Sequence, residues 1–346
     1  MAYTTIDNPE LYFQTVIYTG NATARTITLD GDENMQPDLV WGKIRSEGQD
    51  HVLVDSVRGA TKQLYSSDNA LEQTEAQGLT GFASDGFTLG THAYFNKNTA
   101  TYVAWNWLAG GSASSNGDGS ITSSVSANTT AGFSIVSYTG TGSNATVGHG
   151  LGVAPSMIIV KSRSSTDWWI TYHKSVGATK YVPLNFQNAE ATNSGIWNDT
   201  EPSSSVFSIG TNGGTNGSSN NYIAYCFAEV KGYSKFGSYT GNGNADGTFV
   251  YTGFKPAFII FRRTNGTGNW QLIDNKRIGF NVDNYTLYPN SNIADQDEND
   301  ADILSNGFKL RGTGTDGNGS GDTYIYMAFA ENPFATSGTK AAGTAR

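Results

Sequence analysis

The sequence repeats itself three times, and this repetition constrains the fold more than any other feature. Each copy opens on Tyr-Thr-Gly. A proline before an apolar run, a Phe-x-Leu or Phe-x-Ile segment, and a Tyr-led apolar run then follow in the same order. These landmarks recur about 120 residues from the first copy to the second and about 101 from the second to the third. The sequence therefore predicts a tandem triplication of a unit of about 95 residues. The landmarks begin at Tyr18, Tyr138 and Tyr239; at Pro37, Pro155 and Pro256; at Phe87, Phe207 and Phe308; and at Tyr102, Tyr222 and Tyr324.

The length of the repeat separates it from solenoid repeats of about 20 to 50 residues, whose units cannot fold alone. A unit of this size approaches a small domain. What recurs is apolar and aromatic and lies between turns, which describes a scaffold. Residue types that perform catalysis do not recur. The repetition therefore favours a structural or adhesive role.

Composition indicates an all-β protein. The chain has 42 Gly, 18 Tyr and 17 Phe but only 15% charged residues, a mixture typical of strands joined by tight turns. We expect three tandem, homologous antiparallel β-sandwich-like units with little helix, the one short candidate helix lying at residues 70–77. In the second unit the expected strands are 133–139, 157–161, 168–173, 180–186, 206–209 and 222–229, with 157–160 buried on both faces.

The boundaries between copies follow from shifts in composition. Residues 109–131 are rich in Gly, Ser, Asn and Thr, which is typical of a flexible linker, although 120–125 is a candidate edge strand. We therefore expect the first unit to be loosely attached, so that removing residues 1–108 leaves a folded two-unit fragment. The expected segments are unit one at 1–108, the linker at 109–131, unit two at 132–235, unit three at 236–334 and a flexible tail at 335–346.

Charge and cysteine content exclude several classes of function. The net charge of −9 disfavours binding to a phosphate backbone, so no nucleic-acid partner is expected. Cys226 is the only cysteine and lies in an apolar run, which leaves no disulfide and no thiolate metal cluster. We expect no secretory signal and no membrane insertion, since no apolar stretch approaches the ~20 residues that cross a bilayer.

Catalytic motifs are missing from the sequence, and we expect neither enzymatic activity nor an organic cofactor. The four histidines lack metal-binding spacing, and neither a nucleophile elbow nor a P-loop is present. One acidic run offers closely spaced carboxylates that could surround Ca²⁺, which favours six to eight oxygen ligands, but the run lacks the glycine and terminal glutamate of an EF-hand and a solvated acidic loop is the default interpretation. The weak calcium candidates are Asp295, Asp297, Asp300 and Asp302.

Three tryptophans and one histidine are candidates for a binding surface. Trp168 and Trp169 are adjacent in a predicted strand, so one should point inward and the other outward. Trp270 is their counterpart in the third copy. Exposed tryptophan on a rigid β-surface anchors sugars or proteins, whereas the alternative is that these rings pack the core and the contacts between units. His149, flanked by glycines, is either a ligand contact or a turn residue.

Two long segments carry a resemblance to a known family. Residues 132–155 read GFSIVSYTGTGSNATVGHGLGVAP, and residues 222–241 read YIAYCFAEVKGYSKFGSYTG. Together they resemble a domain family of unknown function that is common in structural proteins of marine tailed bacteriophages, including cyanophages. The resemblance covers nearly the whole chain. It implies a virion component and supplies no catalytic residues.

The expected function combines the repeat with this resemblance. We expect a non-enzymatic virion protein on the phage exterior, associated with the tail or adhesion apparatus, that contacts other virion proteins or host-surface polysaccharide. The alternatives are a capsid decoration protein and a carbohydrate-binding module. Three fused copies could imitate a trimer and match a three-fold partner. The loops diverge most, and Arg58 is expected in unit one alone.

Overall fold

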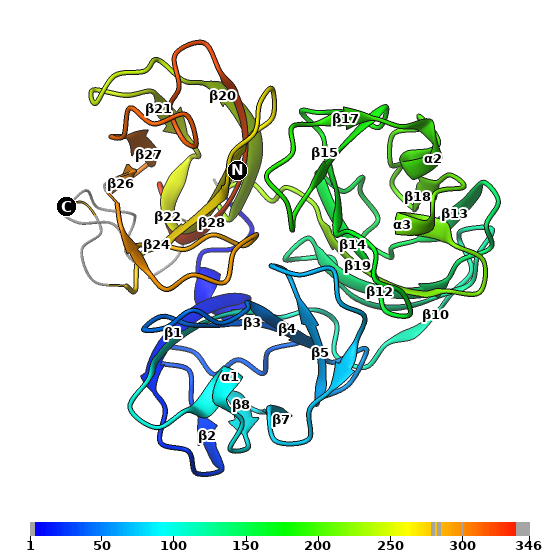
Figure 1. Cartoon of the computed structure of the whole chain (residues 1–346), viewed down its shortest axis with the longest axis horizontal. Coiled ribbons are helices and arrows are strands. Elements are labelled where there is room, and N and C mark those ends of the chain that lie inside the picture. The colour runs from blue at the N-terminus through cyan, green and yellow to red at the C-terminus, as the bar shows by residue number, and fades with distance from the viewer. Residues whose placement is uncertain (1–3, 278–280, 282–284, 299, 337–346) are drawn as a thin grey trace.

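Each copy of the repeat folds into the same pair of antiparallel sheets, and the three copies surround a common centre (Figure 1). The computed structural model describes residues 4–277, 281, 285–298 and 300–336. The described part of the chain has three short α-helices and is otherwise strand, turn and loop, which confirms the predicted all-β fold. No helix in that part is long and apolar enough to cross a membrane.

Unit 1 sets the pattern for the other two. Its larger sheet has the strand order β1-β9-β3-β4-β5-β6, and its smaller sheet has the order β2-β8-β7. A 3-10 turn, η1, precedes β1, and the one-turn helix α1 precedes β9. The elements are η1 (Pro9–Leu11), β1 (Phe13–Thr19), β2 (Arg25–Ile27), β3 (Leu39–Ile44), β4 (Val52–Asp55), β5 (Lys62–Tyr65), β6 (Gln73–Thr74), β7 (Leu79–Ala83), β8 (Gly86–Leu89), α1 (Ala93–Asn96) and β9 (Thr101–Trp107).

Unit 2 repeats this arrangement and extends it at one edge. Its main sheet has the order β10-β11-β12-β19-β14-β15-β16-β17, in which β12, β19 and β14 correspond to β1, β9 and β3, and β13 pairs with β18 in the smaller sheet. The elements are β10 (Ser114–Asn116), β11 (Ser123–Asn128), β12 (Phe133–Thr139), β13 (Ala145–Gly148), β14 (Met157–Ser162), β15 (Ile170–His173), β16 (Lys180–Pro183), β17 (Ala191–Thr192), α2 (Ser194–Trp197), β18 (Val206–Ile209), α3 (Gly213–Asn216) and β19 (Asn221–Phe227).

Unit 3 keeps the central strands and has fewer peripheral ones in its main sheet. Its sheets have the orders β20-β28-β22-β23 and β21-β27-β26, with β24 paired to β25. The elements are β20 (Ser234–Thr240), β21 (Phe249–Tyr251), β22 (Phe254–Arg263), β23 (Trp270–Asp274), β24 (Tyr285–Thr286), β25 (Gln296–Asp297), β26 (Ala301–Leu304), β27 (Gly307–Leu310) and β28 (Thr323–Pro333).

The strand register confirms the repeat residue by residue. Tyr18 lies opposite Tyr102, as Tyr138 lies opposite Tyr222 and Tyr239 opposite Tyr324. The two rings of each pair are stacked, with centroids 5.0, 5.1 and 4.9 Å apart. The prolines are less regular. Pro37 and Pro155 precede β3 and β14, whereas Pro256 lies inside β22 at a bulge.

A buried asparagine secures the same loop in each unit. In unit 1, Asn96 accepts a hydrogen bond from the Asn21 backbone and donates to the carbonyls of Gly90 and Thr23. Asn216 and Asn318 make the corresponding three bonds in the other units. Because a buried amide without partners is costly, these side chains fix the loops that they bridge.

The central strands are apolar on both faces because they separate two cores. In β14, Met157 and Ile159 point into a core shared by all three units, whereas Ile158 and Val160 point into a core private to unit 2. This confirms that 157–160 is buried on both faces. In the other units, Val40 and Ile260 are also fully buried, as predicted.

The shared core contradicts the expectation of a loosely attached first unit. At its centre Trp107, Phe227 and Phe329, which occupy corresponding positions of β9, β19 and β28, contact one another with ring centroids 5.7–6.3 Å apart. Each unit contributes at least eight side chains to this core. Removing residues 1–108 would therefore expose the inner faces of units 2 and 3.

Two local expectations also differ from the structure. Residues 70–77 do not form a helix; they contain β6, which pairs with β5. Residues 109–131, expected to be a flexible linker, provide the hairpin β10–β11, and β11 pairs along β12. The strand candidate at 120–125 overlaps β11, although β10 and not β11 lies at the edge of the sheet. Of the tail at 335–346, residues 337–346 lie outside the described residues.

Candidate functional site

Trp168 is the exposed member of the tryptophan pair and borders a small pocket on unit 2. Its side chain is 37% exposed, whereas Trp169 is fully buried, so the predicted alternation is present. The Phe186 ring packs against Trp168, with centroids 4.8 Å apart and planes inclined by 55°. We call the hollow beside it the Trp168 pocket. Its volume is ≈ 220 Å³, and its lining residues are Asp167, Trp168, Ile170, Tyr181, Ile196, Asn212 and Gly214.

The polar groups of this pocket come from three different segments. Asp167 precedes β15, Tyr181 belongs to β16, and Asn212 caps α3 by accepting a hydrogen bond from the Gly214 backbone. Asp167 accepts one bond from Ser165 through Oδ2. Within the described residues, Asp167 Oδ1, Asn212 Nδ2 and Tyr181 Oη make no hydrogen bond to the protein. The pocket thus combines a tryptophan ring with both donors and acceptors.

Trp169 and Trp270 serve the contacts between units. Trp169 Nε1 donates to the Tyr65 carbonyl of unit 1 over 2.7 Å, and Trp270 Nε1 donates to the Pro183 carbonyl of unit 2 over 2.8 Å. Both rings are fully buried. They are therefore not surface anchors, and the alternative of packing between units is the correct one.

His149 is a buried turn residue rather than a surface contact. Its Nδ1 accepts a hydrogen bond from the Leu151 backbone, and its Nε2 lies 3.2 Å from the Ser203 carbonyl. Burial lowers the pKa of His149 below its ordinary value, and the bond to Ser203 partly opposes this. Its full burial removes it from the binding-surface candidates.

The acidic run does not form a cluster in the structure. Asp295 lies between Arg45 and Arg277, at 2.6 and 2.8 Å, and Asp302 pairs with Arg311. Asp300 accepts a hydrogen bond from Thr286. Burial and the nearby Glu298 raise the Asp300 pKa to about 7. Asp297 is exposed, and no group of three or more metal-binding side chains occurs among the described residues. These carboxylates thus diverge to separate partners.

Polar contacts close the ring of units in a cyclic order. In unit 1, Asp55 pairs with Arg58 and accepts a hydrogen bond from Tyr225 of unit 2 over 2.8 Å. In unit 3, the corresponding Asp274 pairs with Arg277 and accepts a bond from Trp105 Nε1 of unit 1 over 3.0 Å. Arg58 therefore has a counterpart, which corrects the expectation that unit one alone carries it.

The contact from unit 2 to unit 3 uses a histidine instead. His173 occupies the position of Asp55 and Asp274, and its Nε2 lies 3.1 Å from the Tyr326 carbonyl. Its Nδ1 accepts a bond from the Ser175 backbone, so Nε2 carries the proton and donates. Burial lowers the His173 pKa to about 4.

Corresponding residues of all three units line a second hollow, which we call the axial pocket. In each unit a side chain lining this hollow accepts a hydrogen bond from a backbone N–H at the start of β4, β15 or β23. The acceptors are Ser67, Asn185 and Asn290, and the donors are His51, Trp169 and Trp270. Since all three line one hollow of ≈ 480 Å³, it lies at the pseudo-three-fold axis. Its remaining lining residues are Phe186, Gln187, Asn188 and Ser291.

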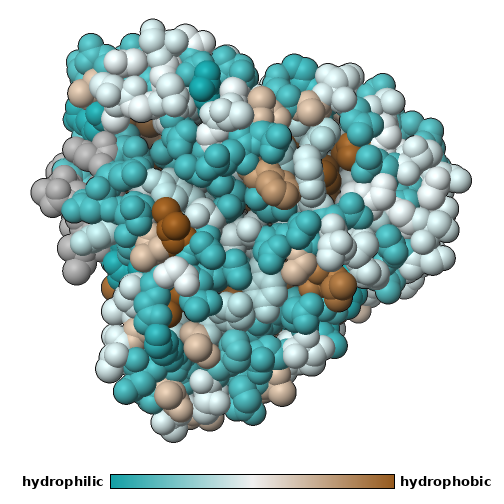
Figure 2. Space-filling view, in the orientation of Figure 1, coloured by the Kyte–Doolittle hydropathy of each residue, from teal (hydrophilic) through white to brown (hydrophobic). Residues whose placement is uncertain are grey.

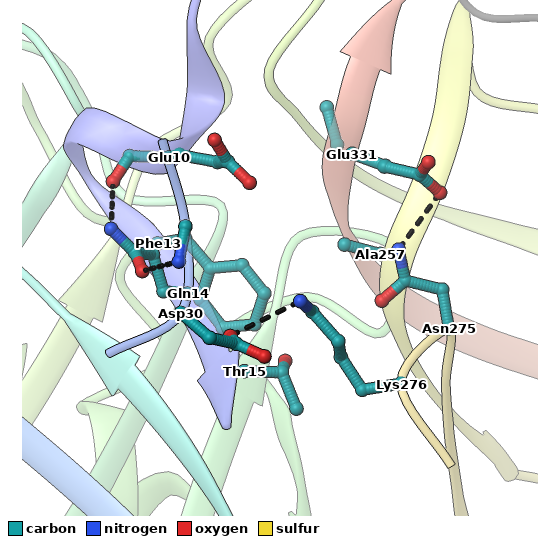
Figure 3. A pocket seen from close by; sticks show the side chains of 11 residues that line it. Glu10, Phe13, Gln14, Thr15, Asp30, Ala257, Asn275, Lys276 and Glu331 are labelled. Atoms are coloured by element: carbon teal, nitrogen blue, oxygen red, sulfur yellow. Dashed lines mark hydrogen bonds and ion pairs between the residues drawn. The ribbon is translucent and has the colours of Figure 1, made fainter. Parts of the chain in front are cut away.

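A narrow crevice between units 1 and 3 is closed by side chains of both (Figure 3). Lys276 Nζ lies 3.1 Å from Asp30 Oδ1, and Asn275 donates to Glu331 over 2.8 Å. The space left is ≈ 30 Å³. That volume suits one or two waters, because a water needs roughly 10–15 Å³ measured in this way. The crevice is an interface and not a ligand site.

The face seen in Figure 2 is mostly hydrophilic or neutral, with hydrophobic residues in small separate groups. Such scattered apolar exposure is normal for a protein surface.

The comparisons with known proteins identify a family. Residues 8–333 match the family described as Domain of unknown function (DUF7483). The comparison with curated proteins gives no match, and neither does the comparison with solved structures.

Proposed function

The chain belongs to the DUF7483 family, a domain of unknown function, and we propose that it is a non-enzymatic structural protein on the exterior of a tailed-phage virion. Its role there is to hold neighbouring virion proteins or to contact the host surface, in the tail or adhesion apparatus. The family resemblance of the sequence suggests the virion, and the architecture of the chain supports the structural role.

One observation carries the proposal: three fused units share a single core and so form a rigid pseudo-trimer in one chain. The aromatic contacts of Trp107, Phe227 and Phe329 fix the units relative to one another. Each unit then presents a related rim, meaning its outer strands and loops, in a fixed orientation relative to the other two units. Such a chain suits attachment to a partner with three-fold or pseudo-three-fold symmetry.

The rims have diverged while the core has been kept, which fits contacts with different neighbours. Among the described residues, unit 2 alone carries the added β10–β11 hairpin. Trp168 stands directly before the buried Trp169 of unit 2, where units 1 and 3 have Asp50 and Asn269. Because loops carry recognition while cores carry packing, the differences are placed where partners would meet the chain.

Immunogold electron microscopy of purified particles tests the proposal. Antibodies against the folded chain should label the outside of intact virions, at the tail or its fibres. Label over the whole head would favour the capsid decoration alternative, which the same pseudo-trimer would suit. Particles that lack the chain altogether would contradict the proposal.

A further inference from the structure

The tryptophan of the Trp168 pocket is present in only one of the three units. Trp168, Asp50 and Asn269 occupy the corresponding position, immediately before Trp169, His51 and Trp270, whose backbones make equivalent hydrogen bonds. Units 1 and 3 thus lack an aromatic ring here. Units 1 and 3 fold without this ring, so the common fold does not require it. Its presence in unit 2 points to a role specific to that unit.

The exposed ring gives the pocket an apolar platform. Trp168 keeps 37% of its surface exposed, and Phe186 holds it from one side. A braced indole loses little conformational entropy on binding and offers a flat face. The apolar C–H face of a pyranose ring is complementary to such a surface.

The rest of the pocket offers hydrogen bonds of both kinds. Asp167 Oδ1 accepts, Asn212 Nδ2 donates, and Tyr181 Oη does either, and none of the three makes a hydrogen bond to the described part of the protein. Sugar hydroxyls also donate and accept. A ring stacked on Trp168 would meet these groups at its edge.

The charge and the volume of the pocket limit the kinds of saccharide that it can bind. Asp167 is the one charged residue of the lining, and the chain carries a net charge of −9, so an acidic polysaccharide would be repelled. The ≈ 220 Å³ volume is below the roughly 300–1,000 Å³ of pockets for drug-sized ligands. One sugar residue or the end of a chain therefore fits.

The axial pocket borders the same aromatic pair as the Trp168 pocket. Phe186, which braces Trp168, also lines the axial pocket, where Asn185, Gln187 and Asn188 bring carboxamides from the same loop. All the lining residues of that hollow are uncharged. The two pockets thus form neighbouring polar, uncharged or weakly acidic surfaces on either side of one aromatic pair.

We propose that unit 2 binds a neutral saccharide, with one sugar ring stacked on Trp168 and hydrogen-bonded by Asp167, Asn212 and Tyr181. The inference deepens the proposed function, because it names the chemistry through which a virion-surface protein would contact a host surface. It stands on the pocket and does not depend on where the chain lies in the particle.

Affinity electrophoresis of the purified full chain tests this proposal. Native gels would contain dextran, mannan or galactan as neutral probes, and alginate as the acidic one. We expect retardation by at least one neutral polysaccharide and none by alginate. Trp168→Ala should weaken the retarding interaction at least tenfold. Phe249→Ala, which removes another exposed aromatic ring far along the chain in β21, is the matched control and should bind as the unaltered chain does.

Asp167→Ala provides a second variant, should Trp168→Ala fail to fold, and it should also lose binding at least tenfold. The proposal is overturned if none of the neutral polysaccharides retards the chain, or if both variants fold and still bind. Loss of particle attachment in Trp168→Ala, without any retardation by polysaccharide, would instead assign the ring to a protein interface. Absence of the chain from virions would contradict the proposed function alone and leave the saccharide result standing.

Discussion

The contact between units 2 and 3 differs from the other two contacts of the ring in its charge. At the unit 1–unit 2 and unit 3–unit 1 contacts, a fully buried Asp–Arg pair receives a hydrogen bond from a side chain of the next unit. At the unit 2–unit 3 contact, a neutral histidine donates to a backbone carbonyl.

The difference follows from the residue that β9, β19 or β28 of the neighbouring unit places at the contact. Trp105 and Tyr225 bring a donor to the acidic partner, whereas the corresponding residue of β28 is Met327, which has none. A carboxylate facing Met327 would be buried without that bond, at a cost of several kcal/mol. A neutral histidine needs only an acceptor, and the Tyr326 carbonyl provides it. The aspartates therefore face strands that supply a side-chain donor, and the histidine faces a strand that supplies a backbone acceptor.

Deleting residues 1–108 is the most severe way to break the ring, because it removes both charged contacts. We expect the remaining chain not to fold as a soluble monomer, since Phe227 and Phe329 lose Trp107 and the shared core is opened. Circular dichroism and gel filtration would measure this. A monomeric fragment with a cooperative thermal transition would show instead that units 2 and 3 stand without unit 1.

Asp55→Asn tests the charged contact directly. It leaves the buried Arg58 guanidinium with Glu72, at 3.4 Å, as its remaining carboxylate partner, and we expect the free energy of unfolding to fall by about 3 kcal/mol, the lower end of the range for a broken buried pair. Asp30→Asn is the matched control, because it breaks the half-exposed pair with Lys276 and should cost less than about 1 kcal/mol. Denaturant melts of both variants give the comparison, and equal losses would refute it.

His173→Ala tests the neutral contact and should have a smaller effect. It removes two neutral hydrogen bonds of the imidazole, one to the Tyr326 carbonyl and one from the Ser175 backbone, for which we expect a loss of about 1–3 kcal/mol. The same denaturant melts apply. A loss as large as that of Asp55→Asn would mean that the histidine is not the weaker solution.

Acid should affect the neutral contact through His173. Its pKa in the folded chain is about 4, below the ordinary 6.5, so between these values the unfolded chain binds more protons. The contribution is therefore complete above about pH 6.5 and declines as the pH falls toward 4. Thermal melts at pH 7 and pH 5 should show a drop in Tm that is smaller in His173→Gln.

The sequence predicted the repeat, the fold class and the doubly buried strands because these depend on local patterns of apolar residues and turns. It also contained a signal that was overlooked: Asn96, Asn216 and Asn318 each stand six residues before the second tyrosine of a stacked pair. That spacing could have identified the buried amides.

Contacts between units could not be predicted in the same way. For Trp169 and Trp270 the linear pattern left both a surface anchor and packing between units open, since only the neighbouring unit supplies the carbonyl that each one binds. The glycine- and serine-rich composition of 109–131 concealed β10 and the pairing of β11 along β12, because a peripheral hairpin needs few apolar residues. For the candidate site, the pattern identified Trp168 but not Asp167, Tyr181 and Asn212, which three separate segments bring to it.

Because the three units belong to one chain, the ring of units stays assembled at low protein concentration. Three separate chains held by the same contacts would dissociate on dilution, since their association depends on concentration. In the fused chain each unit meets its neighbours at an effective concentration set by the connecting segments, which is independent of how many molecules are present. Trp107, Phe227 and Phe329 therefore stay together in a single isolated molecule, and no assembly step precedes the use of the three rims.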